Sequence, residues 1–322
     1  MEKLIKYLKG LEGKKVLIAT HHNADIDAIG SSVGLSLGLE QLGLETSVGV
    51  AESVSRGAKK LASKYDILID PDCSKFDSVI LVDTSVEEQL SSFKNLRADA
   101  VIDHHPEGKL AKDVPSIIEP DTRSSSQIVY RVLKELDCNI TKTIAKVLAA
   151  GIVADTAHMR LADINVFETL SELLKTGIKF ENVLKSIENP IDQSESIAAL
   201  KAIKKSHIYK IGDVLVCTSK VSSHEAPVAR SMMRLGADVA IVAAIKKNEL
   251  RISSRAREKI LPYDIDLSKI FKKVGKIING NGGGHNMAGS ANGKDAKAAN
   301  KALKFILEEL SKKIGKDVKE LD

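Results

Sequence analysis

"KKVLIATHHNADIDAIGSSVGLSLGLEQLG", residues 14–43, decides the fold that we expect for the first half of this chain. Its apolar run at 14–20 predicts a buried strand, and residues 28–43 predict a helix that ends at Gly43, since glycine readily takes the left-handed conformation after a helix. Further β-type runs follow at 46–51, 78–83 and 99–103. Strands alternating with helices predict an α/β fold with a doubly wound, mostly parallel sheet.

The second half of the chain shows a different pattern. Residues from Ser124 to about Ile187 are mostly helical in period, and residues 186–207 contain a proline, a polar run and a lysine-rich helical pattern. Beyond them, strand patterns and a closing amphipathic helix at 294–313 predict a second, smaller α+β domain joined by a linker helix. The expected domains are residues 1–187, 188–206 (linker and connecting helix) and 207–322.

Composition excludes several classes of protein. The 322 residues are 43% hydrophobic and 28% charged, and no long uncharged apolar window predicts a membrane span. The N-terminus has no apolar core of a signal peptide, so we expect a cytoplasmic protein that does not act at a membrane. The three cysteines are widely spaced, which fits neither a disulfide framework nor a CxxC metal site.

Charge is unevenly distributed. Residues 201–322 hold 25 Lys+Arg against 13 Asp+Glu, which leaves 23 against 30 for residues 1–200. A basic half suits a polyanion such as nucleic acid, and an acidic half can collect carboxylates around cations. An unevenly charged solvated surface is the alternative.

Acidic and histidine side chains follow three of the expected strands. His21, Asp25 and Asp27 follow the first run, Asp83 ends the third, and Asp103, His104 and His105 end the fourth. Asp27, which Ala-Ile-Gly-Ser follows, can be a simple helix cap, and a single aspartate after a strand is most often one. Ligands gather beyond the carboxyl ends of parallel strands, however, and clustered carboxylates repel one another unless cations neutralise them. So many candidate ligands of oxygen and imidazole type, without thiolate, favour two Mn²⁺ ions about 3.5–4 Å apart.

Three further segments carry candidate functional residues. Asp155 ends an apolar segment in "GIVADTAHMR". The glycine-rich stretch "IINGNGGGHNMAGS", residues 277–290, is expected to form a loop in which Gly283, Gly284 and His285 approach an anion, with a plain turn as the alternative. Arg255 ends a probable strand and is well shaped to bind phosphate, although a solvated arginine is the commoner case.

"HHNADIDAIGS", "VDTS", "DHHP", "ADTAHM" and "GGGHNMAGS" occur in the order and spacing of the DHH phosphoesterases with their glycine-rich C-terminal partner domain. Over nearly the whole chain, the sequence resembles this family, and in size it resembles the archaeal RecJ-like and NrnA-like oligoribonuclease group. Ala24, where the family often has proline, and Ala288, Gly289 and Ser290, which follow the glycine run, depart from its usual pattern.

The resemblance implies roles for individual residues. His21, Asp25 and Asp83 would hold one Mn²⁺, and Asp27, Asp83, His104 and Asp155 the other, with Asp83 as the bridge. Asp103 would orient an imidazole, and His105 would face the scissile phosphate. Arg255 and His285 would bind that phosphate from the second domain, beside Gly283 and Gly284.

These features predict a Mn²⁺-dependent phosphodiesterase that trims mononucleotides from single-stranded RNA or DNA. A hydrolase of small nucleotides, such as a 3′-phosphoadenosine phosphate or a dinucleotide, is the alternative, since aromatic residues that could stack long strands are few. A third hypothesis is an accessory that docks a replication or repair protein. The apolar face of residues 298–310 also leaves room for a homodimer.

Overall fold

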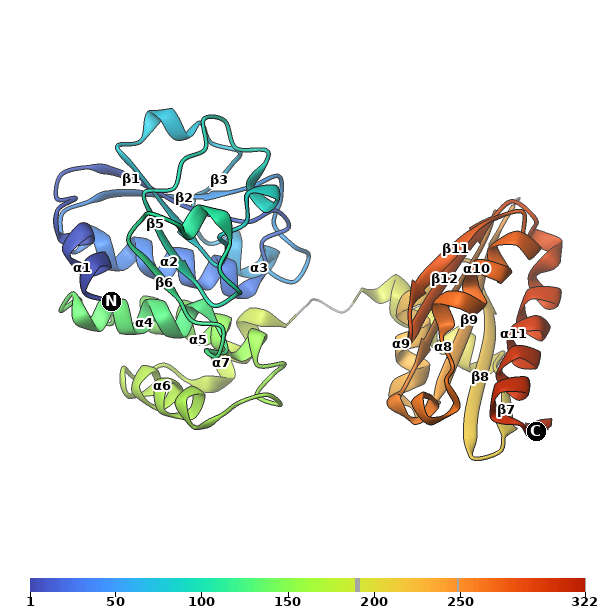
Figure 1. Ribbon diagram of the computed structural model, residues 1–322. Coiled ribbons are helices and arrows are strands. Elements are labelled where there is room, and N and C mark those ends of the chain that lie inside the picture. Colours follow the sequence, from blue (N-terminus) through green and yellow to red (C-terminus); the bar gives the residue numbers. More distant parts are fainter. Residues whose placement is uncertain (189–191, 248, 322) are drawn as a thin grey trace. The chain divides into compact units, whose positions relative to one another are not determined.

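The chain folds into two compact units, residues 1–189 and 190–322 (Figure 1). The computed structural model describes residues 1–188, 192–247 and 249–321. Each unit contains its own β-sheet and its own hydrophobic core. Within the described ranges, no helix is long and apolar enough to cross a membrane.

The first unit is built on a sheet of six parallel strands in the order β3-β2-β1-β4-β5-β6. From β1 the chain continues outward to β2 and β3 on one side, and from β4 it continues to β5 and β6 on the other. The topological switch point therefore lies between the adjacent strands β1 and β4. The predicted mostly parallel α/β sheet is therefore confirmed, although the three-residue strands β3 and β6 were not predicted. The bounds are β1 Lys15–Thr20, β2 Glu45–Val50, β3 Ile67–Ile69, β4 Ser78–Val82, β5 Ala100–Asp103 and β6 Ser116–Ile118.

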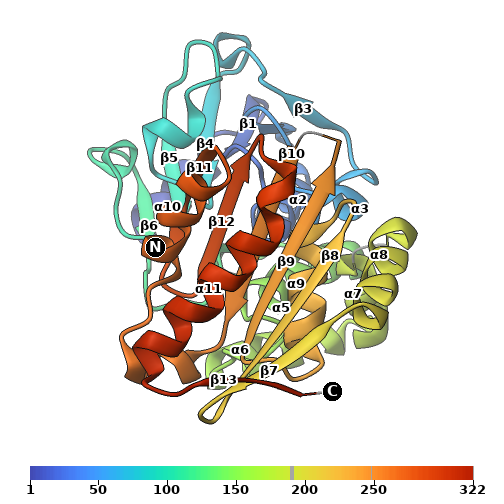
Figure 2. The same ribbon diagram turned by 90° about the vertical axis from the view of Figure 1, so that its right-hand side faces the viewer.

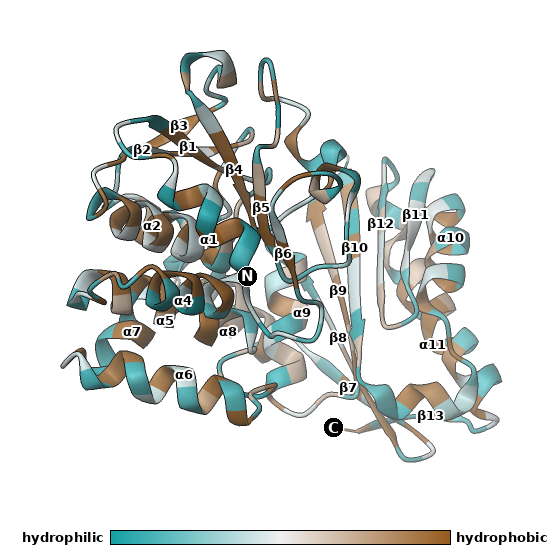
Figure 3. Ribbon diagram, turned by 60° about the vertical axis from the view of Figure 1, so that its left-hand side comes forward, coloured by the Kyte–Doolittle hydropathy of each residue, from teal (hydrophilic) through white to brown (hydrophobic). Residues whose placement is uncertain are grey.

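The central strands are buried on both faces, which explains their continuous hydrophobic runs (Figure 3). Ile18 and Ile80 face the helical layer, whereas Leu17 and Leu81 face a smaller core. That smaller core is closed by loops and short 3₁₀ turns, η1 Cys73–Lys75, η2 Glu87–Leu90 and η3 Lys109–Ala111. The helices are α1 Glu2–Lys9, α2 Ile26–Glu40, α3 Lys59–Ala62, α4 Ser125–Glu135, α5 Lys142–Asp155, α6 Ile164–Lys175 and α7 Phe180–Ile187.

Helices α2 and α5 lie unusually close together because glycine occupies their contact. A Cβ atom on Gly30 would lie 2.5 Å from the carbonyl oxygen of Val147, and Gly34 lies against the side chain of Leu148. Helix α2 ends at Glu40 rather than at Gly43, which lies in the following turn with a φ of 80°. The close packing brings the C-terminal part of α5 against the first turn of α2.

The second unit contains a seven-stranded sheet in the order β11-β12-β10-β9-β8-β7-β13. All neighbours are antiparallel except β8 and β9. Residues 277–290, expected as a loop, instead provide strand β11 and the start of β12. The bounds are β7 His207–Ile211, β8 Val214–Val221, β9 Val239–Lys246, β10 Glu249–Ala256, β11 Gly280–His285, β12 Ala288–Gly293 and β13 Val318–Leu321.

Helices cover both faces of this second sheet. Ile241 of β9 packs in the core beneath α10 and α11, whereas Val242 faces α8 and α9 (Figure 2). Helix α8, expected as a connecting helix, packs against α9 through Ala202. The bounds are α8 Gln193–Lys204, α9 Glu225–Arg234, α10 Leu267–Ile277 and α11 Ala299–Ile314, with 3₁₀ turns η4 Glu258–Tyr263 and η5 Ala296–Ala298.

The apolar face of residues 298–310 does not support a dimer. Leu303, Ile306 and Leu310 are buried in the core of their own unit, against the sheet. The expectation that this helix face is free for a second copy is therefore wrong.

Candidate metal centre

The predicted strand-end residues of the first unit do gather at the switch point. His21 directly follows β1, and Asp25 and Asp27 begin helix α2. Asp83 follows β4, and His104 follows β5. Because β1, β4 and β5 are adjacent and parallel, their carboxyl ends lie at one edge of the sheet.

Asp83 lies at the centre of this cluster. Its side chain is 2% exposed, and its two oxygens face different histidines: Oδ2 lies 3.4 Å from Nε2 of His21, and Oδ1 lies 3.4 Å from Nε2 of His104. The hydroxyl of Ser125 donates to Oδ1 at 2.8 Å. Asp83 also has a φ of 64°, a left-handed backbone that is costly outside glycine and common at functional sites. One carboxylate thus faces two sides of the cluster.

Asp27, His104 and Asp155 form the second side. The fully buried Asp27 accepts hydrogen bonds from the backbone N–H groups of Ser125 (2.6 Å) and Ser126 (3.1 Å), at the start of helix α4. His104 Nε2 lies 3.2 Å from Asp155 but has no aligned hydrogen bond among the described residues, whereas its Nδ1 lies 3.1 Å from the carbonyl oxygen of Thr122. A buried imidazole nitrogen that points at carboxylates without bonding to them suits a metal ligand.

Asp25, rather than Asp27, caps helix α2, and it also lies beside the candidate ligands. Its Oδ1 accepts from the backbone N–H groups of Asp27 (2.9 Å) and Ala28 (3.0 Å) and so caps helix α2. A ligand atom of Asp25 nevertheless lies within 4.8 Å of ligand atoms of His21 and Asp83. The capping interaction fixes the carboxylate beside the cluster, so cap and candidate ligand are compatible.

The ligand atoms fall into three groups, each with all its atoms within 4.8 Å of one another. Asp83 belongs to two of these groups, and so does His104. The groups contain carboxylate and imidazole but no thiol. Such a donor set fits Mn²⁺ and, through the shared carboxylate, fits a pair of ions better than one. The groups are His21, Asp25 and Asp83; Asp27, His104 and Asp155; and Asp83, His104 and His105.

The carboxylates are held in an environment that opposes their charge. Burial is the main cause that raises the pKa of Asp83 well above its usual range, and neighbouring Asp27 and Asp25 add to the effect. Burial and the same kind of repulsion raise the pKa of Asp155 to about 8, and burial raises the pKa of Asp27. A bound cation would relieve this repulsion.

We therefore expect the metal-free protein to lose stability as the pH rises from 6 to 8.5. The folded state keeps protons on Asp155 that the unfolded chain releases near pH 4, so the free energy of unfolding falls as the pH passes through about 8. His105 acts in the same direction: its raised pKa, about 9, stabilises the fold fully below about pH 6.5, and this contribution is lost as the pH rises through 9.

Thermal unfolding in EDTA measures this effect. The midpoint of the transition that Mn²⁺ shifts should fall by at least about 3 °C, the change that roughly 1 kcal/mol produces in a domain of this size. Mn²⁺ should abolish the fall, because cations replace the protons. A midpoint that rises over this range without metal would contradict the assignment.

Asp103 orients His105 rather than His104. The buried carboxylate of Asp103 accepts from the backbone N–H of His105 (3.0 Å), from its Nδ1 (2.9 Å) and from the hydroxyl of Ser85 (2.8 Å). The hydrogen bond to Asp103 is the main cause that raises the pKa of His105 to about 9. For Asp103, burial raises the pKa, but the bonds from His105 and Ser85 outweigh it and lower the pKa. A half-exposed, protonated imidazole is thus held beside the cluster.

The predicted residues of the second unit also lie together. Arg255 of β10 pairs with Ala288 of β12, which pairs with His285 of β11, so the three share one row across the sheet. They line an open hollow of about 850 Å³, together with Gly283 and Gly284. Neither Arg255 nor the nearby Arg230 has an ion-pair partner in the ranges that the structure describes. Burial is the main cause that lowers the pKa of Arg255, and the positive charge of Arg230 adds to the effect. Unpaired neighbouring guanidiniums favour an anion.

The glycines of this stretch have two different roles. Strand β11 packs so closely that a Cβ atom on Gly282 or Gly284 would lie 2.0 Å from a backbone carbonyl oxygen. A Cβ atom on Gly283 would have no other atom within 4 Å, so this glycine faces the open hollow. The loop expected here is instead a β-hairpin, in which Gly282 is needed for packing beneath α10.

Five residues that support the candidate ligands were not predicted from the sequence: Ser85, Thr122, Ser125, Ser126 and Gly151. Gly151 of α5 is needed because a Cβ atom there would lie 2.1 Å from the Ser126 hydroxyl and 2.5 Å from Asp27 Oδ1. The serine run at the start of α4, Ser124–Ser126, was a signal of a helix N-terminus, and such a terminus stabilises a carboxylate. The contacts with Asp27 and Asp83, however, depend on tertiary structure.

Comparison with known proteins identifies the family. The N-terminal domain of the DHH family matches residues 15–152, and the DHHA1 domain matches residues 214–312. The chain belongs to the DHH family. An uncharacterised protein of Methanocaldococcus jannaschii is 36% identical over 318 residues, which cover 94% of each chain.

Two other similarities are more distant. A probable manganese-dependent inorganic pyrophosphatase of Streptococcus thermophilus is 29% identical over 208 residues, 55% of this chain and 64% of that protein. The crystal structure of an exopolyphosphatase-related protein from Bacteroides fragilis has a TM-score of 0.67 at 19% identity and covers 98% of this chain and 97% of that one. The DHH family consists of phosphoesterases, and this chain has their fold and both of their domains.

Proposed function

We propose that this DHH-family phosphoesterase is a manganese-dependent exonuclease that releases mononucleotides from single-stranded RNA or DNA. The observation that carries the proposal is the position of Asp83, whose two oxygens face two different sets of candidate ligands. Similarity to a probable manganese-dependent pyrophosphatase supports manganese as the metal. The basic second half supports nucleic acid as the substrate.

In this proposal, His21, Asp25 and Asp83 hold one ion, and Asp27, Asp83, His104 and Asp155 hold the other. Two such ions supply hydroxide from water at neutral pH and neutralise charge on a phosphate. Asp103 would hold the His105 ring through Nδ1 and raise its pKa, so that the other ring nitrogen could donate to a phosphoryl oxygen as negative charge develops there. Arg255 and His285 of the second unit would bind a substrate phosphate, and Arg255 has no ion-pair partner in the described part of the chain.

The hollow beside Arg255 and His285 is open, which favours a polymer over a small nucleotide. Its floor is a flat sheet face, whereas a small ligand is usually bound in a concave site that encloses most of its surface. A small nucleotide such as a dinucleotide remains the second candidate, because the same centre can hydrolyse it.

A single set of reactions tests the proposed function. Mn²⁺, the full chain and end-labelled 12-nucleotide RNA and DNA strands are incubated beside a 3′,5′-bisphosphate nucleotide and inorganic pyrophosphate. We expect mononucleotide release from at least one strand, dependent on Mn²⁺ and abolished by EDTA. Hydrolysis of the bisphosphate or of pyrophosphate alone would overturn the exonuclease proposal.

The two neighbouring glycines of β11 provide a matched test of the substrate surface. Gly283→Leu should fold normally, because the new side chain enters open space, but it should raise KM for an oligonucleotide by about tenfold or more, as a blocked contact worth ~1.4 kcal/mol would. Gly284→Ala should instead lower the thermal midpoint, because Gly284 has a φ of 142° and its Cβ would collide with Ala288. If Gly283→Leu leaves KM unchanged, substrate does not cross this surface.

A further inference from the structure

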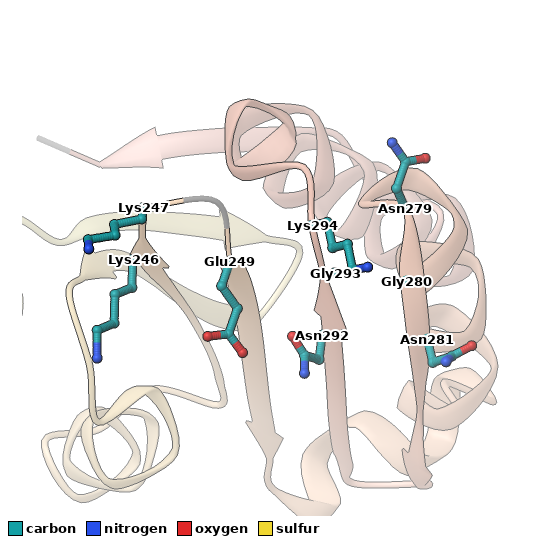
Figure 4. A pocket seen from close by; sticks show the side chains of 9 residues that line it. All are labelled: Lys246, Lys247, Glu249, Asn279, Gly280, Asn281, Asn292, Gly293 and Lys294. Atoms are coloured by element: carbon teal, nitrogen blue, oxygen red, sulfur yellow. The ribbon is translucent and has the colours of Figure 1, made fainter.

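A second hollow, of about 800 Å³, lies at the far end of the same sheet face (Figure 4). Lys246, Lys247 and Lys294 line it with a single acid, Glu249. The remaining lining residues are Asn279, Gly280, Asn281, Asn292 and Gly293.

The charge of this lysine site is uncompensated. All three lysines are exposed, and none has an ion-pair partner within residues 192–247 and 249–321. Glu249 is already engaged, because its Oε1 accepts from Nε (2.9 Å) and from a terminal nitrogen (2.7 Å) of Arg251. The site therefore presents lysine ammonium groups with little acidic competition, as a phosphate-binding site requires.

The two hollows belong to one continuous surface, because Asn281 and Asn292 line both. Strand register explains the continuity. Asn292 of β12 pairs with Arg251 of β10 on one side and with Asn281 of β11 on the other, four residues along β10 from Arg255. Side chains two residues apart share a face, so the path follows the strands. No hydrogen bond occupies either amide side chain among the described residues.

The length of this path suits an oligonucleotide. Six residues separate Arg255 from Glu249, which pairs with Lys246, and at ~3.4 Å per residue the path spans about 20 Å. That is roughly six nucleotides at the 3.4 Å rise of a stacked strand, and fewer for an extended one. A dinucleotide held at Arg255 and His285 is too short to reach the lysines.

We infer that the lysine site binds the phosphates of a single-stranded nucleic acid several nucleotides away from the phosphate at Arg255 and His285. The inference rests on the proposed function and adds a preference for longer strands. Lysine binds phosphate as a point charge, and among the described residues no phenylalanine, tyrosine or tryptophan lines either hollow. Binding should therefore involve the backbone of the strand, depend strongly on salt and show little base preference.

The test replaces Lys246, Lys247 and Lys294 with alanine in the full chain. The control replaces Lys272, Lys276 and Lys301, which are exposed on α10 and α11 at the opposite face of the sheet, so that both variants lose three positive charges. Binding of fluorescein-labelled 12-nucleotide RNA and DNA strands is measured in EDTA by anisotropy between 50 and 300 mM salt. KM is measured with Mn²⁺ for the 12-nucleotide and dinucleotide substrates.

We expect the lysine-site variant to bind the 12-nucleotide strands at least tenfold more weakly at low salt. Its log–log salt slope should fall by about 2, since each phosphate contact to a single strand contributes ~0.7. In the wild type and the control, KM should be lower for the 12-nucleotide substrate than for the dinucleotide. This difference should be lost in the lysine-site variant alone. Equal effects in the two triple variants, or none in either, would overturn the inference, with unchanged thermal midpoints showing that both variants fold.

The binding and hydrolysis results separate the two proposals. If neither strand is hydrolysed but only the lysine-site variant loses binding, the exonuclease function fails and the lysine site stands as a nucleic-acid site. If both substrates are hydrolysed with equal KM by every variant, the exonuclease function stands and the lysine site fails.

Discussion

Asp83→Asn should reduce turnover by at least about 10³-fold while leaving the metal-free protein at least as stable as the wild type. Asparagine keeps the shape of the side chain and an oxygen that can accept from Ser125. It removes a buried charge that Asp27 and Asp25 repel, so the fold loses nothing without metal. The variant should therefore lose only the ability to bind cations.

Thermal unfolding with and without Mn²⁺ separates these effects. At 100-fold excess over its Kd, a bound ligand stabilises by about 2.7 kcal/mol, so the wild type should gain roughly 5–10 °C and the variant much less. Asp113→Asn is the matched control: Asp113 is exposed and has a φ of 65°, close to the 64° of Asp83. Near-normal turnover in Asp83→Asn would exclude the bridging role.

Gly151→Ala should damage the centre without changing any candidate ligand. Alanine favours a helix by about 1 kcal/mol over glycine, so a simple propensity argument predicts stabilisation. The new methyl group would instead collide with Asp27 and Ser126, and overpacking of this kind costs about 1–3 kcal/mol. We expect Mn²⁺ to bind roughly 10–100-fold more weakly, the usual effect of disturbing the residues that orient metal ligands.

Gly34→Ala provides the control for this prediction. It overpacks the same helix pair, but its Cβ would meet the end of the flexible Leu148 side chain, 2.5 Å away, rather than a candidate ligand. Stability should fall, and the Kd for Mn²⁺ should stay within about twofold of the wild type, because no group that orients a ligand moves. Equal losses of Mn²⁺ affinity in both variants would show that Asp27 is not positioned through Gly151.

The strand-end residues could be predicted because parallel strands bring their carboxyl ends to one edge whatever their exact register. His21, Asp83 and His104 needed only the order of apolar runs to be placed together. The cap alternative was placed on Asp27, which Ala-Ile-Gly-Ser follows, but the structure shows that Asp25 Oδ1 caps the helix while Asp25 stays beside His21 and Asp83.

The glycine-rich hairpin could not be predicted from local sequence. Glycine has a low β-propensity, so residues 280–285 suggest a turn. Their strand conformation is imposed by close packing against Phe271 of α10 and by pairing with β12. Strands β3 and β6 are three residues long and give too short a pattern, and the contact of Ser126 with Asp27 joins residues 99 positions apart.

The proposed function requires that Asp83 is shared by two metal ions. Equilibrium dialysis of the purified chain against Mn²⁺, followed by electron paramagnetic resonance, tests it most directly. We predict two Mn²⁺ per chain with the magnetic coupling of carboxylate-bridged ions, and loss of that coupling in Asp83→Asn. One ion per chain, or two ions without coupling, would contradict the account.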